Sequence, residues 1–300
     1  MSLLRLFLLS LLFPLVVVSQ ERKNPVFVST QWLSEHLKDS DLVVLHVAFN
    51  RHEYTAGHIP GARFLWYNWL AVSTPDASTE MPPAEPADTL LASFGITEGS
   101  TIVLCFGGSN VSTTTRMFLA LSYFGFGNQT SILDGGFEMW KSENRAISTE
   151  LPAVEQTSLT LKVQPQVITD TEWVKGNLMN SNVAIVDARA KTFYDGNGGG
   201  IVRQGHIKGA KSIPFTMVLD STNKVLGQSA LEEVFREAGI KKGMKVVSYC
   251  HVGQQATLVY SVARMLGYDA AVYDGSFEDW NVRGEEYPVE KPAPPAGTKK

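Results

Sequence analysis

A cysteine at the end of an apolar run is the residue of this sequence best suited to chemistry. Cys250 follows residues 245–249 and opens the short loop 250–255, which leads into an apolar-periodic helix predicted from about residue 255 to 266. Main-chain N–H groups that converge at such a turn stabilise a thiolate, which is the nucleophilic form of cysteine. The pattern therefore predicts a reactive thiol, and the alternative is a small apolar residue buried at a strand end.

The loop after this cysteine is suited to holding an anion. We expect its main-chain amides to point inward as an anion nest, and Gly253 lets the backbone turn tightly without a Cβ clash. The side chains at the mouth offer hydrogen-bond donors, although a solvated loop residue is the alternative for His251. The residues of this loop predicted to bind substrate are His251, Val252, Gly253, Gln254, Gln255 and Ala256.

Two arginines are candidates for a cation that binds an anionic group. Arg189 stands in Asp187-Ala188-Arg189, after the apolar run 183–186, and its guanidinium can bind such a group through two hydrogen bonds. The alternative for Arg189 is a structural ion pair with Asp187 or with a surface carboxylate. Arg203 is a weaker candidate for the same pocket.

The chain contains an internal duplication. The hexapeptide Gly-His-Ile-Pro-Gly-Ala at 57–62 recurs as Gly-His-Ile-Lys-Gly-Ala at 205–210, and the segment 134–140 (DGGFEMW) recurs at 274–280 (DGSFEDW). Because His58 and His206 occur in both turns, we interpret them as turn-fixing residues rather than catalytic bases.

Each half also repeats the same order of apolar runs and helices. Continuous apolar runs that alternate with helices are typical of parallel strands buried on both faces. We therefore predict two doubly wound α/β domains that bind ligands beyond the carboxyl ends of their strands. The paired strands are 42–47 and 183–186, 101–105 and 245–249, and 131–133 and 271–273, and the paired long helices are about 113–124 and 255–266.

Together these features resemble a two-domain rhodanese-type sulfurtransferase, the family of thiosulfate and 3-mercaptopyruvate sulfurtransferases. The resemblance covers nearly all of residues 25–290 and rests on the paired turns, the paired Asp-Gly-x-Phe-x-x-Trp endings, Asp187-Ala188-Arg189 and the Cys250 loop closed by Ala256. It implies two tandem rhodanese-like domains, each with a mainly parallel five-stranded sheet flanked by helices. It also implies an inactive first domain and a catalytic second domain in which Cys250 carries sulfur as a persulfide.

The residues themselves support this asymmetry between the halves. Superposing the second apolar runs puts Phe106 at the place of Cys250, and phenylalanine cannot attack sulfur. The segment His46-Val47-Ala48 matches Asp187-Ala188-Arg189, so the first half also lacks the arginine. Cys105 falls inside the strand run, where a buried inert thiol is the favoured interpretation.

The implied reaction is a two-step sulfur transfer from an anionic donor to a thiophilic acceptor such as cyanide or a thiol. Thiosulfate-specific members resemble Cys-Arg-Lys-Gly-Val-Thr and mercaptopyruvate-specific members Cys-Gly-Ser/Thr-Gly-Val-Thr, whereas this loop, Cys-His-Val-Gly-Gln-Gln, has neither pattern. We favour thiosulfate because glutamine and histidine can donate hydrogen bonds to sulfonate oxygens. The alternative is a 3-mercaptopyruvate sulfurtransferase.

The sequence argues against two other classes of protein. Cysteine phosphatases of a related fold need an arginine six positions after the cysteine, and that position is Ala256. A non-enzymatic thiol-sensing or binding module would be favoured by loss of the cysteine or of the loop glycine, and both are present.

The length and composition of the chain indicate how many domains it has and which partners it can bind. A chain of 300 residues is long enough for two domains, each with its own core. The balance of 26 basic and 30 acidic side chains, with no basic stripe, argues against a nucleic-acid partner. Two cysteines, one in each half, suit neither a zinc site nor a disulfide framework. We therefore expect no metal, no cofactor and a monomer that binds a small anionic sulfur donor and a thiophilic acceptor.

The N-terminal residues 1–19 are typical of a secretory signal peptide. A cationic start at Arg5 precedes an apolar stretch at 6–18 that is short for a membrane span, and Ser19 fits a cleavage site before Gln20. A retained anchor is the alternative. We expect a periplasmic or secreted enzyme with no stable membrane association after cleavage.

The remaining boundaries divide the chain into an inactive domain at 25–145, a linker at 146–166, a catalytic domain at 167–288 and a flexible tail at 289–300. The proline-rich segment 72–88 interrupts the first half. We interpret it as a plain surface loop, and the alternative is a cover for the cleft between the domains.

Overall fold

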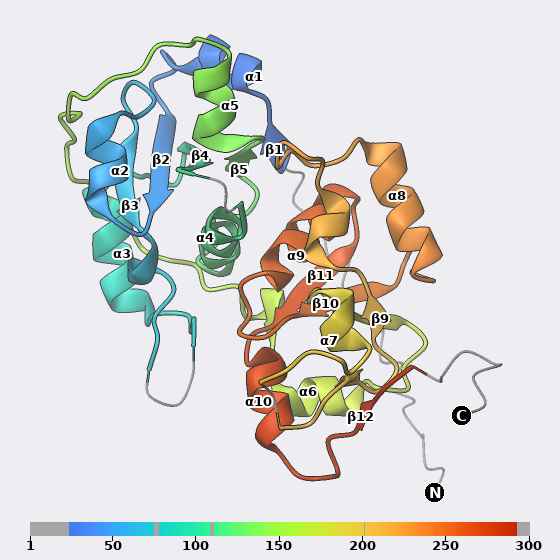
Figure 1. Cartoon of the computed structure of the whole chain (residues 1–300). Helices are drawn as coiled ribbons and strands as arrows, with labels where there is room; N and C mark the ends of the chain where they lie inside the picture. Colours follow the sequence, from blue (N-terminus) through green and yellow to red (C-terminus); the bar gives the residue numbers. More distant parts are fainter. Residues whose placement is uncertain (1–23, 75–77, 109–110, 201, 293–300) are drawn as a thin grey trace, which may run out of the picture.

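The computed structural model describes residues 24–74, 78–108, 111–200 and 202–292, which form two α/β domains placed side by side (Figure 1). The sheet of the first domain has the strand order β1-β5-β4-β2-β3, and its strands pair in parallel throughout. Its strands are β1 (Phe27–Val28), β2 (Leu42–Ala48), β3 (Arg63–Trp66), β4 (Thr101–Phe106) and β5 (Thr130–Leu133). Its helices are α1 (Thr30–His36), α2 (Arg51–Ala56), α3 (Ala84–Ser93), α4 (Val111–Tyr123) and α5 (Gly136–Ser142), with a 3-10 turn at Tyr67–Trp69.

The second domain repeats this topology with the strand order β6-β11-β10-β7-β9, again parallel throughout. Both predicted five-stranded sheets are therefore confirmed. The strands are β6 (Ile168–Thr169), β7 (Val183–Asp187), β9 (Lys211–Ser212), β10 (Lys245–Tyr249) and β11 (Asp269–Tyr273). The helices are α6 (Thr171–Gly176), α7 (Lys191–Tyr194), α8 (Gln228–Glu237), α9 (Ala256–Met265) and α10 (Ser276–Val282), with 3-10 turns at Pro165–Val167 and Phe215–Val218.

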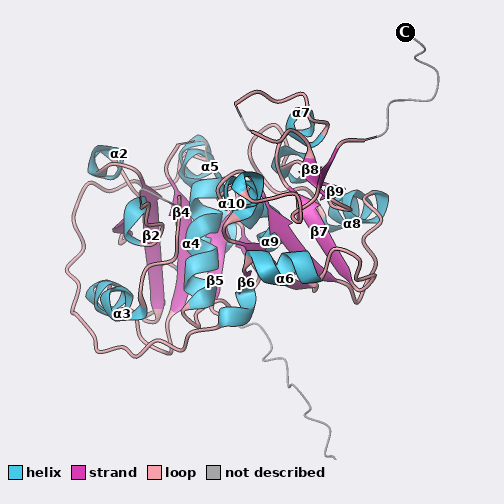
Figure 2. Ribbon diagram, turned by 90° about the horizontal axis from the view of Figure 1, so that it is seen from below, coloured by secondary structure: helices cyan, strands magenta, loops and turns pink. Residues whose placement is uncertain are grey.

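Helices cover both faces of each sheet, which explains the unbroken apolar runs in the sequence (Figure 2). Every residue of β4 is buried, as are four of the five residues of β10. One buried apolar cluster includes residues of both sheets together with α4 and α9. The two domains therefore share a continuous core between them.

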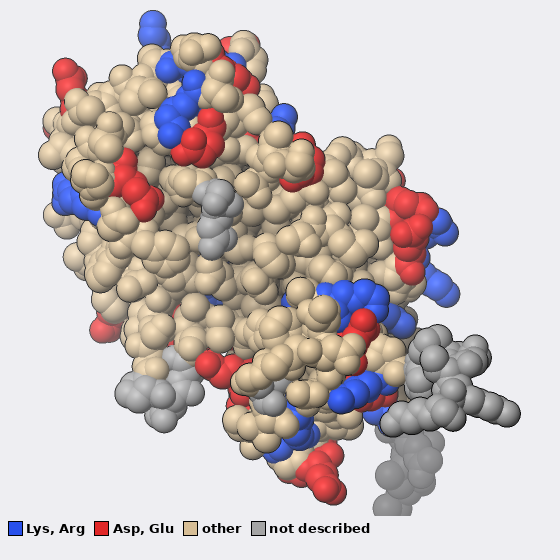
Figure 3. Space-filling model, in the orientation of Figure 1, with Lys and Arg blue, Asp and Glu red and all other residues tan. Residues whose placement is uncertain are grey.

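The domain interface is built where α4 packs against α9. The hydroxyl groups of Thr115 and Thr257 lie 2.7 Å apart, and the rings of Phe118 and Tyr260 have centroids 6.1 Å apart. On the face shown in Figure 3, acidic and basic side chains lie interspersed toward the edges, and the area between the domains is mainly uncharged. The interface thus combines apolar packing with buried polar contacts.

The duplicated Asp-Gly segments each reach the opposite domain. Asp134, after β5, accepts a hydrogen bond of 2.9 Å from the amide of Val225 in the second domain. Asp274, after β11, pairs with Arg116 of α4 in the first domain. The repeated aspartate therefore serves the assembly of the two halves.

Two segments differ from the sequence-based expectation. The tail begins later than residue 289, because Val289–Glu290 forms β12 and pairs antiparallel with β8 (His206–Ile207). The segment 72–88 is not a plain surface loop: α3 begins inside it at Ala84, and the hydroxyl of Thr79 donates to the Val252 carbonyl of the Cys250 loop. Polar groups of this segment find their partners in the other domain, and such contacts have no sequence pattern.

The predicted signal peptide at 1–19 and most of the predicted tail lie outside the described residues. Within the described ranges, every helix falls short of the length and apolar character that crossing a bilayer requires.

Candidate active site

Cys250 lies at the carboxyl end of β10, between that strand and α9. Its amide donates to Ser276 Oγ at 3.3 Å, and its carbonyl accepts from the amide of Phe277 at 3.0 Å. The carbonyl of His251 accepts from the amide of Glu278 at 2.8 Å. The loop is therefore held against the start of α10 by main-chain groups, and the residue that carries the thiol is only 1% exposed.

The amides that follow Cys250 have no acceptor in the part of the chain that the structure describes. Among the residues that the structure describes, the N–H groups of residues 251–255 donate no hydrogen bond to a main-chain or side-chain acceptor. Unpaired amides at a chain turn are rare in folded proteins, and a cluster of them is a binding site for an anion. This arrangement supports the predicted anion nest around the thiol.

Gly253 makes the turn of the loop possible. Its φ of +78° is in the left-handed region, which residues with a side chain rarely adopt. A Cβ atom at this position would lie 2.9 Å from the carbonyl oxygen of Asp274. Glycine is thus required by the backbone conformation, which is the tight turn expected from the sequence, and also by the close approach of another segment.

A cavity of about 490 Å³ opens on the thiol. Four of the predicted substrate-binding residues line it, and Gly253 and Ala256 shape the loop without lining the cavity. Two lining residues come from elsewhere in the chain: Ser112 from α4 of the first domain and Phe215 from the 3-10 turn after β9. The complete lining consists of Ser112, Phe215, Cys250, His251, Val252, Gln254 and Gln255.

Arg189 is held as a buried ion pair rather than as part of the cavity wall. Its guanidinium is 0% exposed and binds the Asp187 carboxylate through Nε at 2.9 Å and Nη2 at 2.6 Å. Nη2 also donates to the carbonyl of Gly205, and the group lies 3.9 Å from the ring centroid of Phe277. Tyr249 Oη completes the site by donating to Asp187 at 2.8 Å. The structural ion pair that was the alternative for Arg189 is therefore present.

Arg203 lies away from the thiol. Its guanidinium donates to the carbonyl oxygens of Trp280, Asn281 and Tyr287. It therefore fastens the end of α10 and the segment that follows it, and it is not brought to the cavity that Cys250 lines.

His251 faces the cavity as a neutral group at physiological pH. Burial lowers the pKa of its imidazole below the usual 6.5, and the positive charge of Arg189 lowers this pKa further. Its ring packs edge-on against Phe193, with centroids 4.4 Å apart. His251 can therefore offer a hydrogen bond to an anion but no positive charge near pH 7.

The first domain supplies contacts that sequence analysis did not find. Arg116 is fully buried and donates to the carbonyl of Gly253 at 3.4 Å as well as binding Asp274 at 2.5 Å. Thr79 donates to the carbonyl of Val252. These donors engage the loop carbonyls, which leaves the amides of the same peptides for a ligand. The signal available in the sequence was only a lone arginine in an otherwise uncharged helix.

The equivalent place in the first domain cannot perform this chemistry. The strand registers pair Tyr249 with Asp187 and Cys105 with His46, so Phe106 occupies the position of Cys250. Burial raises the pKa of the Cys105 thiol well above its usual range, so this thiol stays protonated. The first domain therefore lacks a nucleophile at this position.

The two Gly-His-Ile turns are built alike in both domains. The ring of His58 stacks on Tyr54 and the ring of His206 on Tyr194, and in each pair Nδ1 lies 2.8 Å from the tyrosine carbonyl. The contact is the same in the domain that carries Cys250 and in the domain that has no equivalent cysteine. This supports the interpretation that both histidines fix their turns.

Comparison with known proteins agrees with this architecture. The family model described as "Rhodanese-like domain" matches residues 29–143 and again residues 170–283. The thiosulfate sulfurtransferase of Azotobacter vinelandii is 26% identical over 257 residues, which span 85% of this chain and 94% of the relative. The 3-mercaptopyruvate sulfurtransferase of Rattus norvegicus is 29% identical over 278 residues, which span 86% of this chain and 92% of the relative.

Solved structures show the same fold. The crystal structure of YnjE superposes with a TM-score of 0.80 at 22% sequence identity, covering 90% of this chain and 69% of that one. The wild-type structure of EanB has a TM-score of 0.77 at 21% identity, covering 90% of this chain and 70% of that one. The chain belongs to the rhodanese-like domain family and carries two such domains in tandem. Its curated relatives include thiosulfate and 3-mercaptopyruvate sulfurtransferases, so the predicted thiosulfate sulfurtransferase-like class is confirmed at the level of the family.

Proposed function

We propose that this protein is a sulfurtransferase that moves sulfane sulfur from a small anionic donor to a thiophilic acceptor through a persulfide on Cys250. The observation that carries the proposal is the run of unpaired amides at residues 251–255 next to a thiol in a cavity of about 490 Å³. Such amides stabilise negative charge wherever it forms on sulfur or on a departing oxyanion. Membership of the rhodanese-like family supports the same chemistry.

The reaction proceeds in two displacements. The Cys250 thiolate attacks the outer sulfur of thiosulfate, the sulfur–sulfur bond of the donor breaks, and sulfite leaves with the bonding electron pair. The enzyme then carries one additional sulfur as Cys-S-S⁻. A cyanide or thiolate acceptor attacks the terminal sulfur, and the electron pair of the enzyme's sulfur–sulfur bond returns to Cys250. No external oxidant or reductant is required.

We favour thiosulfate as the donor, with 3-mercaptopyruvate as the alternative. His251, Gln254 and Gln255 line the cavity and offer donors to sulfonate oxygens. Arg189 lies behind the loop, and its charge lowers the pKa of His251, while the charge of its partner Asp187 opposes this effect. Cleavage of 3-mercaptopyruvate leaves pyruvate, whose enolate needs a proton, and no lining residue is a strong acid near pH 7.

Mass spectrometry tests the proposal directly. Treatment of the full chain with thiosulfate should add about 32 Da to Cys250, and the adduct should disappear on addition of cyanide. Cys250→Ser should show neither the adduct nor turnover with either donor, while Cys105→Ser, the matched control in the first domain, should retain both. Residual transfer above a few per cent in Cys250→Ser would refute the assigned nucleophile.

Steady-state rates distinguish thiosulfate from 3-mercaptopyruvate as the donor. We expect kcat/KM for thiosulfate to exceed that for 3-mercaptopyruvate in the wild type, with thiocyanate or pyruvate as the measured product. The reverse order would assign the alternative donor without disturbing the role of Cys250. If neither donor leaves sulfur on the thiol, the thiol-sensing or binding function that sequence analysis kept open would be favoured instead.

We also propose that the protein is exported and that residues 1–19 are removed. The support is the charge and hydropathy of this segment. N-terminal sequencing of the mature protein should start at Gln20, and an intact N-terminus would favour a retained anchor.

A further inference from the structure

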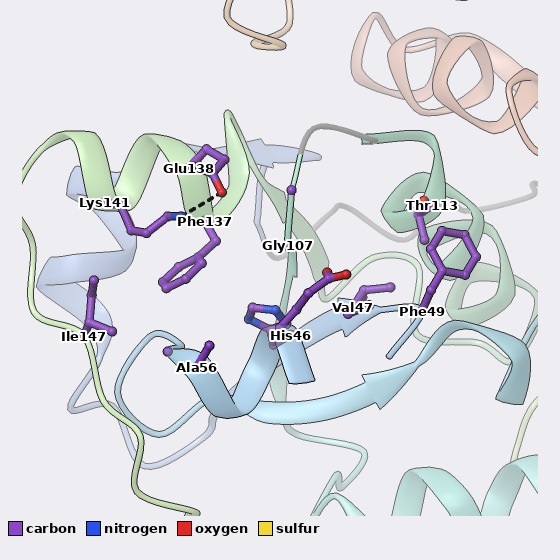
Figure 4. A pocket seen from close by; sticks show the side chains of 14 residues that line it. His46, Val47, Phe49, Ala56, Gly107, Thr113, Phe137, Glu138, Lys141 and Ile147 are labelled. Carbon is purple, nitrogen blue, oxygen red and sulfur yellow. Dashed lines mark hydrogen bonds and ion pairs between the residues drawn. The ribbon is translucent and has the colours of Figure 1, made fainter. Parts of the chain in front are cut away.

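The first domain contains a cavity of its own at the place where the second domain has the buried ion pair of Asp187 and Arg189. The cavity measures about 500 Å³, within the range of about 300–1,000 Å³ usual for small-molecule sites. Figure 4 shows His46 at its centre, with side chains of β2, α2, α4 and α5 around it. Its main walls are formed by His46, Phe49, Thr113, Phe137, Lys141 and Ile147.

This cavity exists because large residues of the catalytic domain are replaced by small ones. The strand registers align His46 with Asp187 and Cys105 with Tyr249, so Ala48 replaces Arg189 and Gly107 replaces His251. The shared contacts of Tyr54 and Tyr194 likewise align Glu53 with Phe193. The guanidinium, phenol and imidazole that fill this space in the second domain are thus absent from the first.

His46 is left without the partners that its counterpart has. It is 1% exposed, and neither ring nitrogen has a hydrogen-bond partner among the residues that the structure describes. Asp187, by contrast, is bound by both Arg189 and Tyr249. Burying an imidazole without partners is unfavourable by roughly 1–3 kcal/mol for each polar group. A ligand that accepts from one ring nitrogen or donates to the other would remove this penalty.

A second buried polar group faces the same space. Thr113 lines the cavity from the first turn of α4, and its hydroxyl also has no partner in the described part of the chain. The walls between these polar groups are apolar, since Phe137 meets His46 edge-on with centroids 5.5 Å apart and Phe49 and Ile147 complete the lining. Flat aromatic walls with two inward polar groups suit a ring that carries a hydrogen-bonding group.

The charge at the mouth of the cavity is negative. Lys141 is paired with Glu138 at 2.8 Å, so these two charges offset each other. Glu53 lines the cavity, is exposed and forms no ion pair with any described residue, and its Oε1 accepts only from Asn50 Nδ2 at 2.7 Å. An ammonium group at the mouth would therefore find an unneutralised carboxylate.

We propose that this cavity is a binding site for a small aromatic amine, with the ring against Phe137 and Ile147, a polar ring atom on His46 and the ammonium group beside Glu53. The site is separate from the Cys250 cavity and takes the opposite charge from an anionic sulfur donor. Because the pKa of His46 is lowered to about 4, chiefly by burial, the imidazole is neutral at pH 7 and gives an anion no electrostatic stabilisation.

Calorimetric titration of the full chain with matched indoles tests this proposal. Tryptamine should bind saturably, 3-methylindole more weakly, and indole-3-acetate, which carries the same ring and the opposite charge, weakest of the three. Glu53→Gln should weaken tryptamine several-fold and leave 3-methylindole unchanged. His46→Phe should weaken both compounds about tenfold, the effect expected for one lost hydrogen bond worth about 1.4 kcal/mol.

Gly107→Ala is the variant that tests the proposed cavity most directly. Its φ lies outside the left-handed region, so alanine is tolerated by the backbone, but its Cβ would stand 2.8 Å from His46 Nε2 and 3.3 Å from Glu53 Oε2. It should abolish tryptamine binding, whereas Gly99→Ala, where the nearest atom is Thr97 Oγ1 at 3.8 Å, should not.

Sulfur transfer at Cys250 should persist in all of these variants, which shows that they are folded, and Cys250→Ser should bind tryptamine normally. The proposal is overturned if indole-3-acetate binds as well as tryptamine, if Gly107→Ala binds tryptamine normally, or if no compound binds saturably. None of these outcomes bears on the proposed persulfide, because they concern a different cavity.

Discussion

Arg116 of the first domain and Asp274 of the second form a buried ion pair, with Nη1 and Oδ1 2.5 Å apart, directly behind the loop that carries Cys250. The same guanidinium donates to the carbonyls of Gly253 and Thr79. One side chain of the domain without a nucleophile thus fixes both the catalytic loop and the segment around Thr79 that contacts it. The first domain therefore has a structural role in the reaction, because it holds the catalytic loop in place.

Replacement of this arginine should therefore affect both stability and rate. Arg116→Met leaves the Asp274 carboxylate without its cation, and breaking a buried ion pair in this way lowers the free energy of unfolding by about 3–5 kcal/mol. The Gly253 carbonyl also loses a donor, so we expect kcat to fall. Urea unfolding and steady-state kinetics measure the two effects.

The double variant Arg116→Met/Asp274→Asn is the control, since it removes the unpaired charge. It should recover part of the stability, while the rate stays low because the loop carbonyl is still without its donor. Full activity of Arg116→Met would show that the contact does not position the loop.

A matched pair of glycines separates backbone strain from loop geometry. Gly253 and Gly267 have φ values of +78° and +80°, but a Cβ would meet Asp274 only at Gly253 and open space at Gly267. Both alanine variants should lose about 1–2 kcal/mol of stability from the left-handed backbone. Only Gly253→Ala should also reduce kcat/KM, by about 100-fold, because a displacement of about 1 Å at a catalytic loop has effects of this size. Equal activity of the two variants would contradict the requirement for a close approach here.

Much of the fold could be read from the sequence because the signals are local. The apolar runs at 101–105 and 245–249 became β4 and β10, and the duplicated turns mark equivalent places in two equivalent sheets. The catalytic loop was also accessible, since a strand, a cysteine and a glycine follow one another along the chain. Patterns within a few residues express backbone conformation and burial, which are what the sequence encodes most directly.

Contacts between distant segments could not be read in this way. Thr79, Ser112 and Arg116 reach the site across the domain interface, and the only mark of this in the sequence is that Arg116 stands alone in an otherwise uncharged helix. Arg189 shows a second limit, because its position after a strand is compatible both with binding substrate and with pairing to Asp187. Only the positions of the atoms distinguish these two roles.

The role of Arg189 can be tested by separating stability from donor binding. Arg189→Met leaves Asp187 buried without its cation and should lower the free energy of unfolding by about 3–5 kcal/mol. The double variant Arg189→Met/Asp187→Asn should restore much of this stability. If Arg189 acts only through the ion pair, the double variant should also recover the wild-type KM for thiosulfate.

A KM that stays high in the double variant would instead reveal a long-range electrostatic contribution of the guanidinium to donor binding. The measurement therefore tests the predicted role of Arg189 in substrate binding, because the buried ion pair alone does not decide whether Arg189 has that role.

His46 should make the stability of the protein depend on pH in a predictable direction. Its pKa is about 4 in the folded protein, because burial and then the charges of His58 and Lys141 oppose protonation, against about 6.5 in the unfolded chain. Below pH 6.5 the unfolded chain therefore binds a proton that the folded protein does not, and stability falls as the pH falls. The difference in pKa corresponds to about 3 kcal/mol between pH 7 and pH 4.

This contribution can be isolated by comparing the wild type with His46→Gln, which titrates nowhere in this range. The free energy of unfolding from urea titrations at several pH values should fall by about 3 kcal/mol more for the wild type than for the variant between pH 7 and pH 4. Because other titrating groups contribute equally to both proteins, they cancel in the difference. Parallel curves would mean that the imidazole is protonated as easily in the folded chain as in the unfolded one, and the cavity of the first domain would then hold a cation below about pH 6.5.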